Sequence, residues 1–390
     1  MSQTISAQVQ LRPQIERSRP DFVMIGIIAV LTALGLLMIL STSGPRLEAE
    51  GSVRASQMIR QSTFVVLGVV TFFVATILSD RQWRLLTPWV YAVTLALLAL
   101  VLGIGELIGG AQRWIPLGLF NLQPSEVAKP AVILGLAALL AGAVEGQVKW
   151  SRIFKAFALV GVPAILIFLQ PDLGTMLVFG FVTVVMLFAA GTDVRQIVIL
   201  GLVAIAALII AIEADLLAEY QVDRLTGFLS PGEQTLSINY NQIQSQIAIG
   251  GGGMFGQGLF EGTQTNLAFV PAQTTDFIFT AVAEQLGFAG AATVIALYSV
   301  LVLRLLIIAS TARDRFGRLV ASGMAAMIAF HVFVNIGMTV GLLPVTGLPL
   351  PFLSFGGSFY ISTLFGLGVA HSIWIHRSRI PLGAVPGRAV

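Results

Sequence analysis

The sequence predicts an all-α polytopic membrane protein, and two observations carry that prediction. Of the 390 residues, 56% are apolar and only 11% are charged, and the mean hydropathy is +0.90. So few charges cannot cover the surface of a water-soluble globule of this length. The apolar residues also fall into runs of roughly twenty, the length that a helix needs to cross a bilayer. We therefore expect about ten transmembrane helices.

The apolar runs also define the domain organisation of the chain. Helices are expected to start near Phe22, Thr63, Pro88, Pro124, Ile153, Pro171, Gln196, Asp276, Leu319 and Ser358. One long connection of about sixty residues, 215–275, separates the seventh helix from the eighth. The chain then divides into an N-terminal tail at 1–21, a ten-helix membrane domain at 22–376 and a C-terminal tail at 377–390.

The distribution of charge predicts how the helices are oriented. With ten helices, 16 of the 22 Lys and Arg residues fall in the tails and in the even-numbered loops. Because positive residues accumulate on the cytoplasmic side, both termini are expected in the cytoplasm and the long loop outside. The net charge of +3 is too small, and too evenly shared among the loops, to suggest a nucleic-acid partner. The chain has no cysteine, so no disulfide is expected.

Asp276 is the first candidate for a catalytic side chain. It lies in the stretch 270–286, where the long polar loop ends and an apolar helix begins. A carboxylate at that junction is partly desolvated and can be aimed at a substrate at the membrane surface, which suits a general base. The alternative is that an acidic residue after Thr275 only complements the dipole of a helix start.

Three further outward segments interrupt the hydrophobic pattern, at 109–129, 170–175 and 344–358. Together with the long loop they precede helices four, six, eight and ten, so four helix N-termini are expected at the outer interface. Helix N-termini with Arg113 and Lys129 nearby form a site for an anion, and a lipid-linked phosphate or diphosphate is the natural candidate there. Trp114 is a candidate platform for stacking a sugar.

Several of these polar residues also have a structural interpretation. Glu126 and Lys129, three apart on one helix face, form either a structural ion pair or part of the reaction centre. Asp172 could be a helix cap, Glu284 is expected to be paired inside the bundle, and His331 is expected to pack in an apolar helix. The glycine run at 250–253 is interpreted as a flexible linker in preference to a phosphate-binding nest. No spacing of His, Cys or carboxylates resembles a dedicated metal site.

Six ordered motifs in this sequence resemble those of the SEDS family (shape, elongation, division, sporulation). They are A-Q-R-W-I-P-L-G from Ala111, Q-P-S-E-V-A-K from Gln123, Q-P-D-L-G-T from Gln170, N-Q-I-Q-S-Q-I-A-I-G from Asn241, T-D-F-I-F-T-A-V-A-E-Q-L-G from Thr275, and the long run N-I-G-M-T-V-G-L-L-P-V-T-G-L-P-L-P-F-L-S-F-G-G-S from Asn335. The segment F-E-G-T-Q-T-N from Phe260 is similar to the elongation branch of the family and unlike the division branch.

The resemblance implies a peptidoglycan glycosyltransferase that polymerises lipid II at the outer face of the bacterial cytoplasmic membrane. It also implies a class B penicillin-binding protein as transpeptidase partner, with other membrane proteins of the elongation complex. Asp276 matches the family's essential aspartate. The chain departs from the family pattern at Ala272, where Glu is common, and at Thr274, where His is frequent. These departures leave Asp276 with fewer ionisable neighbours.

The motifs extend the candidate site beyond the catalytic aspartate. The substrate-binding candidates are Arg113, Trp114, Gln123, Ser125, Glu126, Lys129, Asp172, Gln244, Ser245, Thr275, Ser354 and Ser358. A divalent cation, Mg²⁺ or Mn²⁺, could lie between phosphate oxygens and Asp172 or Glu126; no organic cofactor is expected. Two rival functions remain open at this point. One is a flippase for the same lipid, and the other is a scaffold without catalysis.

Overall fold

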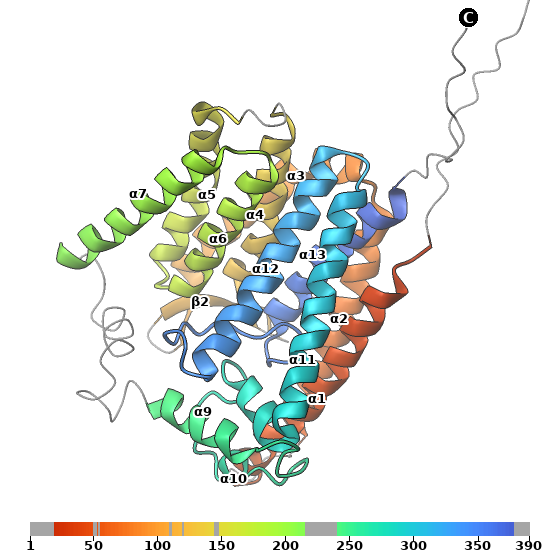
Figure 1. The fold of residues 1–390 in the computed structure, drawn as a ribbon, viewed down its shortest axis with the longest axis vertical. Helices are drawn as coiled ribbons and strands as arrows, with labels where there is room; N and C mark the ends of the chain where they lie inside the picture. Colours follow the sequence, from red (N-terminus) through yellow and green to blue (C-terminus); the bar gives the residue numbers. More distant parts are fainter. Residues whose placement is uncertain are drawn as a thin grey trace, which may run out of the picture.

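The computed structural model describes residues 19–49, 53, 55–108, 111–118, 121–143, 148–214 and 240–377, and most of them are helical. The long helices stand side by side as one bundle, while α7 leans away from it (Figure 1). The helices are α1 (Phe22–Ala49), α2 (Ser56–Ile77), α3 (Asp80–Ile104), α4 (Pro124–Ala141), α5 (Trp150–Phe168), α6 (Leu173–Ala189), α7 (Val194–Glu213), α9 (Tyr240–Gly251), α10 (Thr263–Asn266), α11 (Ile278–Thr311), α12 (Arg315–Thr339) and α13 (Gly357–His376).

The predicted membrane class is confirmed at the level of the helices. Within the described residues, eight helices are long and apolar enough to cross a bilayer. Two more apolar helices, Leu173–Ala189 and Val194–Ala207, are shorter than that criterion. The ten predicted positions match α1 to α7 and α11 to α13 in order. The chain is therefore a helical, multi-pass membrane protein.

Several helices begin earlier than the apolar runs indicate. The structure starts α2 at Ser56 and α3 at Asp80, where the sequence pattern suggests Thr63 and Pro88. Pro88 lies inside α3 and does not start it. These differences have one cause, because the first turns of both helices are polar and an apolar criterion excludes them. Pro124, by contrast, occupies the first turn of α4, as predicted.

A small antiparallel sheet departs from the all-α prediction. Its strands are β1 (Glu106–Ile108), β2 (Ala111–Pro116) and β3 (Asn121–Leu122), in the order β1-β2-β3. β2 pairs with both neighbours, placing Ile115 opposite Leu122. The sheet fills the connection between α3 and α4, which carries the first polar motif. Arg113 and Trp114 are therefore on a strand, where the sequence alone gave no regular element.

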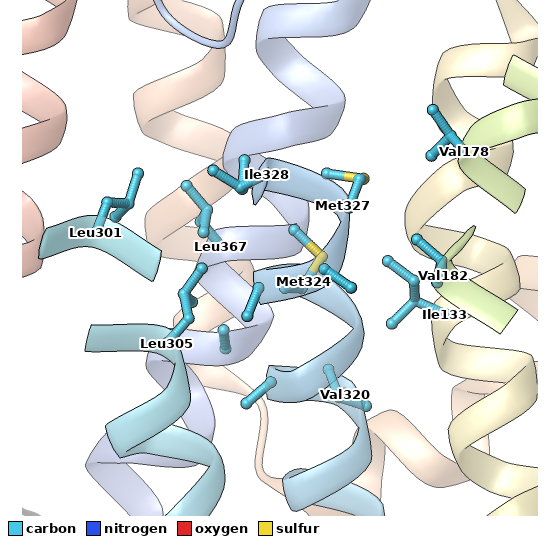
Figure 2. Packing of buried hydrophobic residues seen from close by; sticks show 14 of the residues in the cluster. Ile133, Val178, Val182, Leu301, Leu305, Val320, Met324, Met327, Ile328 and Leu367 are labelled. Carbon is cyan, nitrogen blue, oxygen red and sulfur yellow. The ribbon is translucent and has the colours of Figure 1, made fainter. Parts of the chain in front are cut away.

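The hydrophobic core is centred on α12. Figure 2 shows Val320, Met324, Met327 and Ile328 of this helix between neighbours on both sides. Ile133 of α4 and Val178 of α6 lie on one side, and Leu301 of α11 and Leu367 of α13 lie on the other. A helix surrounded in this way is fixed by packing along its length, so polar residues on it have defined positions.

The interpretation of residues 250–253 as a flexible linker is wrong. A Cβ on Gly252 would lie 2.0 Å from the carbonyl oxygen of Ala283, so this stretch lies directly against α11. Gly287 interrupts α11 with φ 67° and ψ −166°. The backbone from Gly253 onward enters that break, and Phe288 N–H donates to the carbonyl of Gly253 at 2.9 Å.

Two other predictions are settled or delimited by the structure. A tryptophan near the start of an apolar run is ordinarily expected to anchor at the membrane interface, but Trp83 is buried, and its indole N–H donates to the carbonyl of Ala75 at 3.1 Å. The described part of the long loop holds α9 and α10, which lie together at one end of the bundle (Figure 1). Residues 1–18, 215–239 and 378–390 lie outside the described residues, so the predictions for the two tails and for most of the loop remain predictions.

Candidate active site

Asp276 lies two residues before the first turn of α11 and is half-buried. The helix starts at Ile278, and the N-cap position is occupied by Phe277. The backbone N–H of Asp276 donates to the carbonyl of Ala272 at 3.1 Å, which closes a tight turn before the helix. Asp276 is therefore not the N-cap residue of this helix, although it lies close to the positive end of its dipole.

Two residues from later in the chain fix the backbone around Asp276. The amide nitrogen of Asn335 donates to the carbonyl of Asp276 at 2.8 Å and to that of Leu348 at 2.7 Å. The hydroxyl of Ser354 donates to the carbonyl of Thr275 at 2.5 Å. The predicted residues Thr275 and Ser354 are thus brought together through the backbone of one and the side chain of the other. The segment 344–356 holds the turn that presents Asp276.

The same segment connects Asp276 to the start of α6. Gly347 has φ +74°, and a Cβ built on it would lie 3.5 Å from a carboxylate oxygen of Asp276. A Cβ on Gly174 would lie 3.1 Å from the carbonyl oxygen of Thr346 and 3.0 Å from the side chain of Leu348. Three residues, 346–348, therefore separate the aspartate from the N-terminus of α6.

Asp172 caps α6 and also contacts α4. Its carboxylate accepts from the backbone N–H of Thr175 at 3.1 Å and from the hydroxyl of the same residue at 2.9 Å. The hydroxyl of Ser125 donates to it at 3.1 Å. The interpretation of Asp172 as a helix cap is confirmed, and its half-buried carboxylate also ties the first turns of α4 and α6 together.

Arg113 reaches from β2 to the turn between α5 and α6. Its guanidinium donates to the carbonyl of Gln170 at 2.6 Å and to the carbonyl of Pro171. A guanidinium has five N–H donors, and its contacts within the described residues use two of them, which leaves three for an anion. Trp114 is half-buried on the same strand, and neighbouring side chains of a strand point to opposite faces. Arg113 and Trp114 therefore do not share one face of β2.

Glu126 and Lys129 form the predicted ion pair on α4. The Lys129 ammonium lies 2.8 Å from each oxygen of Glu126 and 3.2 Å from Nε2 of His331. It also lies 5.2 Å from the ring centre of Phe359. An ammonium has three donors, and this geometry uses all three inside the protein. Lys129 is 2% exposed, so a direct contact with a phosphate would require the pair to open.

Ser358, at the start of α13, joins the candidate site to β3. Its hydroxyl donates to the carbonyl of Asn121 at 3.0 Å and accepts from the backbone N–H of Gln123 at 3.0 Å. Gln123 is the N-cap residue of α4. The starts of α4 and α13 are therefore held side by side, and two of the predicted substrate-binding residues are in direct contact.

Gln244 and Ser245 lie on α9, and the structure separates their surroundings. The Ser245 hydroxyl is fully buried, 2.7 Å from the hydroxyl of Thr280 and 2.8 Å from the carbonyl of Thr339. It connects α9 to α11 and α12 from inside the protein. Gln244 is half-buried, so it remains the more accessible of the two predicted substrate contacts.

Of the two carboxylates predicted to bind a divalent cation, Asp172 suits that role and Glu126 does not. Both oxygens of Glu126 face the Lys129 ammonium, so that side chain is not placed to bind a metal. No group of three or more metal-ligating side chains occurs within the described residues. Mg²⁺ commonly takes one protein carboxylate together with phosphate oxygens of the substrate, and Asp172, which is half-buried, has the chemistry for that role.

Asn335 is a site residue that the candidate list from the sequence missed. It begins the longest motif, but an amide in an apolar helix carries no charge to draw attention to it. The prediction for Glu284 is confirmed, because its buried carboxylate accepts from the backbone N–H of Gln264 at 2.6 Å and from the hydroxyl of Thr265 at 2.6 Å. This side chain holds α10 and is not available to a substrate.

Known proteins resemble this chain along nearly its whole length. Residues 21–379 match a family model described as cell cycle protein, which covers FtsW, RodA and SpoVE. The peptidoglycan glycosyltransferase MrdB of Escherichia coli K12 is 37% identical over 92% of this chain and 95% of its own. The stage V sporulation protein E of Bacillus subtilis is 36% identical over 91% of this chain and 96% of its own.

Solved structures resemble it as well. A chain of a peptidoglycan synthase complex, described as coordinating polymerisation and crosslinking, matches with a TM-score of 0.76 and 35% identity, over 92% of this chain and 98% of that one. The crystal structure of the rod shape determining protein RodA from Thermus thermophilus matches with a TM-score of 0.67 and 31% identity, over 93% and 98%. The chain therefore belongs to the FtsW, RodA and SpoVE family of cell cycle proteins, the SEDS family.

Proposed function

We propose that this protein is a peptidoglycan glycosyltransferase that polymerises lipid II during cell elongation, with Asp276 as its general base. Membership of the family and the activity named for the relatives support the reaction class. The observation that carries the role of Asp276 is its place in the fold. Its carboxylate lies at a helix start, and its backbone is fixed by Asn335 and its turn by Ser354.

The reaction joins two sugars and releases a lipid diphosphate. A hydroxyl of the acceptor sugar, the 4-hydroxyl, attacks the anomeric carbon of the donor, and the bond from that carbon to the diphosphate oxygen breaks. Asp276 takes the hydroxyl proton as the new bond forms, a contribution of about 10² to 10⁴ in rate. The leaving group departs with the bonding electrons. A single displacement of this kind inverts the anomeric centre.

The departing diphosphate needs positive charge, and Arg113 supplies it in this proposal. Three of its N–H donors are left after its contacts to Gln170 and Pro171, and it lies beside the N-terminus of α6. Lys129 contributes as a buried charge behind the site, since its own donors face Glu126 and His331. Asp172 would hold Mg²⁺ or Mn²⁺, which would neutralise part of the diphosphate charge.

The proposed topology places this chemistry at the outer face of the bacterial cytoplasmic membrane. We propose ten spans, with α6 and α7 crossing the membrane, both chain ends in the cytoplasm and residues 215–275 outside. The excess of Lys and Arg in the tails and even-numbered loops supports this orientation. The similarity to a chain of a peptidoglycan synthase complex supports a class B penicillin-binding protein as the transpeptidase partner, alongside other elongation-complex proteins.

One experiment tests the activity and the role of Asp276. Wild type and Asp276→Asn are purified with the transpeptidase partner and given lipid II in detergent, where no membrane separates two compartments. We expect glycan chains on a gel from the wild type and none from a folded, partner-bound Asp276→Asn, because the amide cannot accept the proton. Parallel reactions with Mg²⁺, Mn²⁺ or a chelator test the cation.

The alternatives predict different results in the same assay. A flippase has no task in detergent, so it makes no glycan chains from lipid II. A scaffold without catalysis also makes none, and it tolerates Asp276→Asn in assembly. Glycan chains from both wild type and Asp276→Asn would instead support the glycosyltransferase activity and contradict the role of Asp276 as general base.

A further inference from the structure

Two polar side chains on α12 are fully buried in the apolar bundle. His331 and Asn335 are both 0% exposed, and they lie four residues apart on α12, which is packed on both sides by other helices of the core. Residues four apart are neighbours on one helix face. Burying polar groups inside a membrane domain has a free-energy cost, so the contacts of these two side chains have to offset it. Their contacts lead to two different parts of the candidate active site.

His331 completes the contacts of the Lys129 ammonium. Its Nδ1 lies 2.8 Å from the carbonyl of Met327, so that nitrogen carries the hydrogen and donates it. Its Nε2 is then an acceptor, and it faces the Lys129 ammonium at 3.2 Å. The ring stacks on Phe359 with centres 5.1 Å apart. Lys129 in turn holds Glu126, which is next to Ser125 in the first turn of α4. Through these contacts His331 fixes the helix turn that carries Ser125, whose hydroxyl donates to Asp172.

Asn335 fixes the other part of the site. Its amide nitrogen donates to the carbonyls of Asp276 and Leu348, both within 2.8 Å. Because both neighbours are acceptors, the orientation of the amide is determined. Among the described residues its oxygen is buried and has no hydrogen-bond partner. A buried amide that leaves one acceptor unused is placed by its two donor contacts, and these hold the turn before α11 against residues 346–348.

We propose that His331 and Asn335 are positioning residues that together set the geometry between the diphosphate side of the site and Asp276. The α12 backbone between them is a rigid spacer of about 6 Å, four residues at the rise of an α-helix. One end holds the start of α4 through Lys129, and the other holds the backbone of Asp276. This inference rests on the proposed function, because it names residues that serve that reaction without touching the substrate.

A kinetic comparison of variants tests the proposal. The variants are Asn335→Ala, His331→Leu, the double variant, His331→Gln and the control Thr363→Val, all purified with the transpeptidase partner. Thr363 is buried on α13, and its hydroxyl has no hydrogen-bond partner within the described residues, so its removal tests burial of a polar group alone. The readouts are kcat and KM for lipid II polymerisation and the thermal midpoint of unfolding in detergent.

The kinetic changes expected for positioning residues differ from those expected for residues that only stabilise the fold. Each of Asn335→Ala and His331→Leu should lower kcat by about 10²-fold with KM nearly unchanged, because misplacement of the base by a fraction of a bond length is felt in the chemical step. His331→Gln should recover most of that loss, since its amide oxygen can accept from Lys129. The double variant should lose less than the product of the two single losses, because both act on one geometry.

Three results would overturn the proposal. They are a folded Asn335→Ala or His331→Leu with the wild-type kcat, single losses that multiply in the double variant, or a loss in His331→Gln equal to that in His331→Leu. If Asn335→Ala does not fold, the comparison of His331→Leu with His331→Gln tests the proposal alone. Recovery of kcat in His331→Gln supports the positioning role of His331, and no recovery contradicts it. An inactive wild type would instead refute the proposed function, so the two failures are distinguishable.

Discussion

A single arginine illustrates how one side chain can serve both fold and reaction. Arg113 donates to two successive carbonyls, of Gln170 and Pro171, at the turn that leads into α6. Hydrogen bonds from a charged donor are each worth about 1.5 to 3 kcal/mol, so this contact orders the connection between β2 and the bundle. The same guanidinium has further donors for an anion. Substitutions can therefore distinguish its role in ordering the turn from its role in binding the diphosphate.

We expect Arg113→Lys to damage both roles, and to different extents. A lysine keeps the charge but cannot bridge two carbonyls in the fork geometry of a guanidinium. The variant should therefore unfold at a lower temperature in detergent and should show a raised KM for lipid II. Arg113→Gln, which also removes the charge, serves as the comparison. Equal KM values for the two variants would show that the charge of residue 113 does not contact the substrate.

At the residue scale, sequence reasoning found the charged members of the site and missed an uncharged one. Asp276 stands out because a carboxylate between a polar loop and an apolar helix is rare and costly. Asn335 does not, since one amide in a helix gives no pattern. The second partner of Lys129 was also beyond reach, because His331 is 202 residues away and only the fold brings the two together.

At the scale of elements, the break in α11 determines how the loop and the bundle fit. Gly287 has φ 67°, and a Cβ there would lie 2.3 Å from the backbone nitrogen of Gly256 and 2.6 Å from that of Phe255. Backbone atoms cannot move aside as a flexible side chain can. The glycine is therefore required by both its conformation and its surroundings.

Gly287→Ala should consequently destabilise the protein by about 3 kcal/mol or more, from positive φ and overpacking combined. The measurement is the thermal midpoint of unfolding in detergent. Gly180→Ala is the matched control, because Gly180 lies in α6 with nothing within 4 Å of an added Cβ. Alanine there should be neutral or stabilising by up to about 1 kcal/mol. Equal midpoints for Gly287→Ala and the control would contradict the description of the break.

The elements themselves were predictable to different degrees, for physical reasons. The start of α4 followed from Pro124, because proline suits the first helical turn. The β-sheet gave no signal, since its strands span 3, 6 and 2 residues and are too short for an alternating pattern. The break at Gly287 was equally hidden, because one glycine inside an apolar run is compatible with an unbroken helix.

At the scale of the whole molecule, the number of spans depends on α6 and α7. α6 has 17 residues, and the apolar part of α7 is Val194–Ala207, so both are short for a bilayer. If both cross, the turn between them faces the cytoplasm. If neither crosses, that turn stays on the outer side with the end of α5 and the start of α11. The side on which this turn lies therefore separates ten spans from eight.

The natural chain has no cysteine, so single cysteines can report this topology without a background signal. We expect Val194→Cys, 61% exposed at the start of α7, to react with a membrane-impermeant maleimide only after spheroplasts are permeabilised. Phe255→Cys, 82% exposed in the outer segment, should react in intact spheroplasts, and Thr311→Cys at the end of α11 should not. With both controls as expected, labelling of Val194→Cys in intact spheroplasts would reduce the spans to eight and leave α6 and α7 outside the bilayer core. Protection of all but Phe255→Cys would support the ten-span arrangement, which places the starts of α4, α6 and α13 on the same side as Asp276.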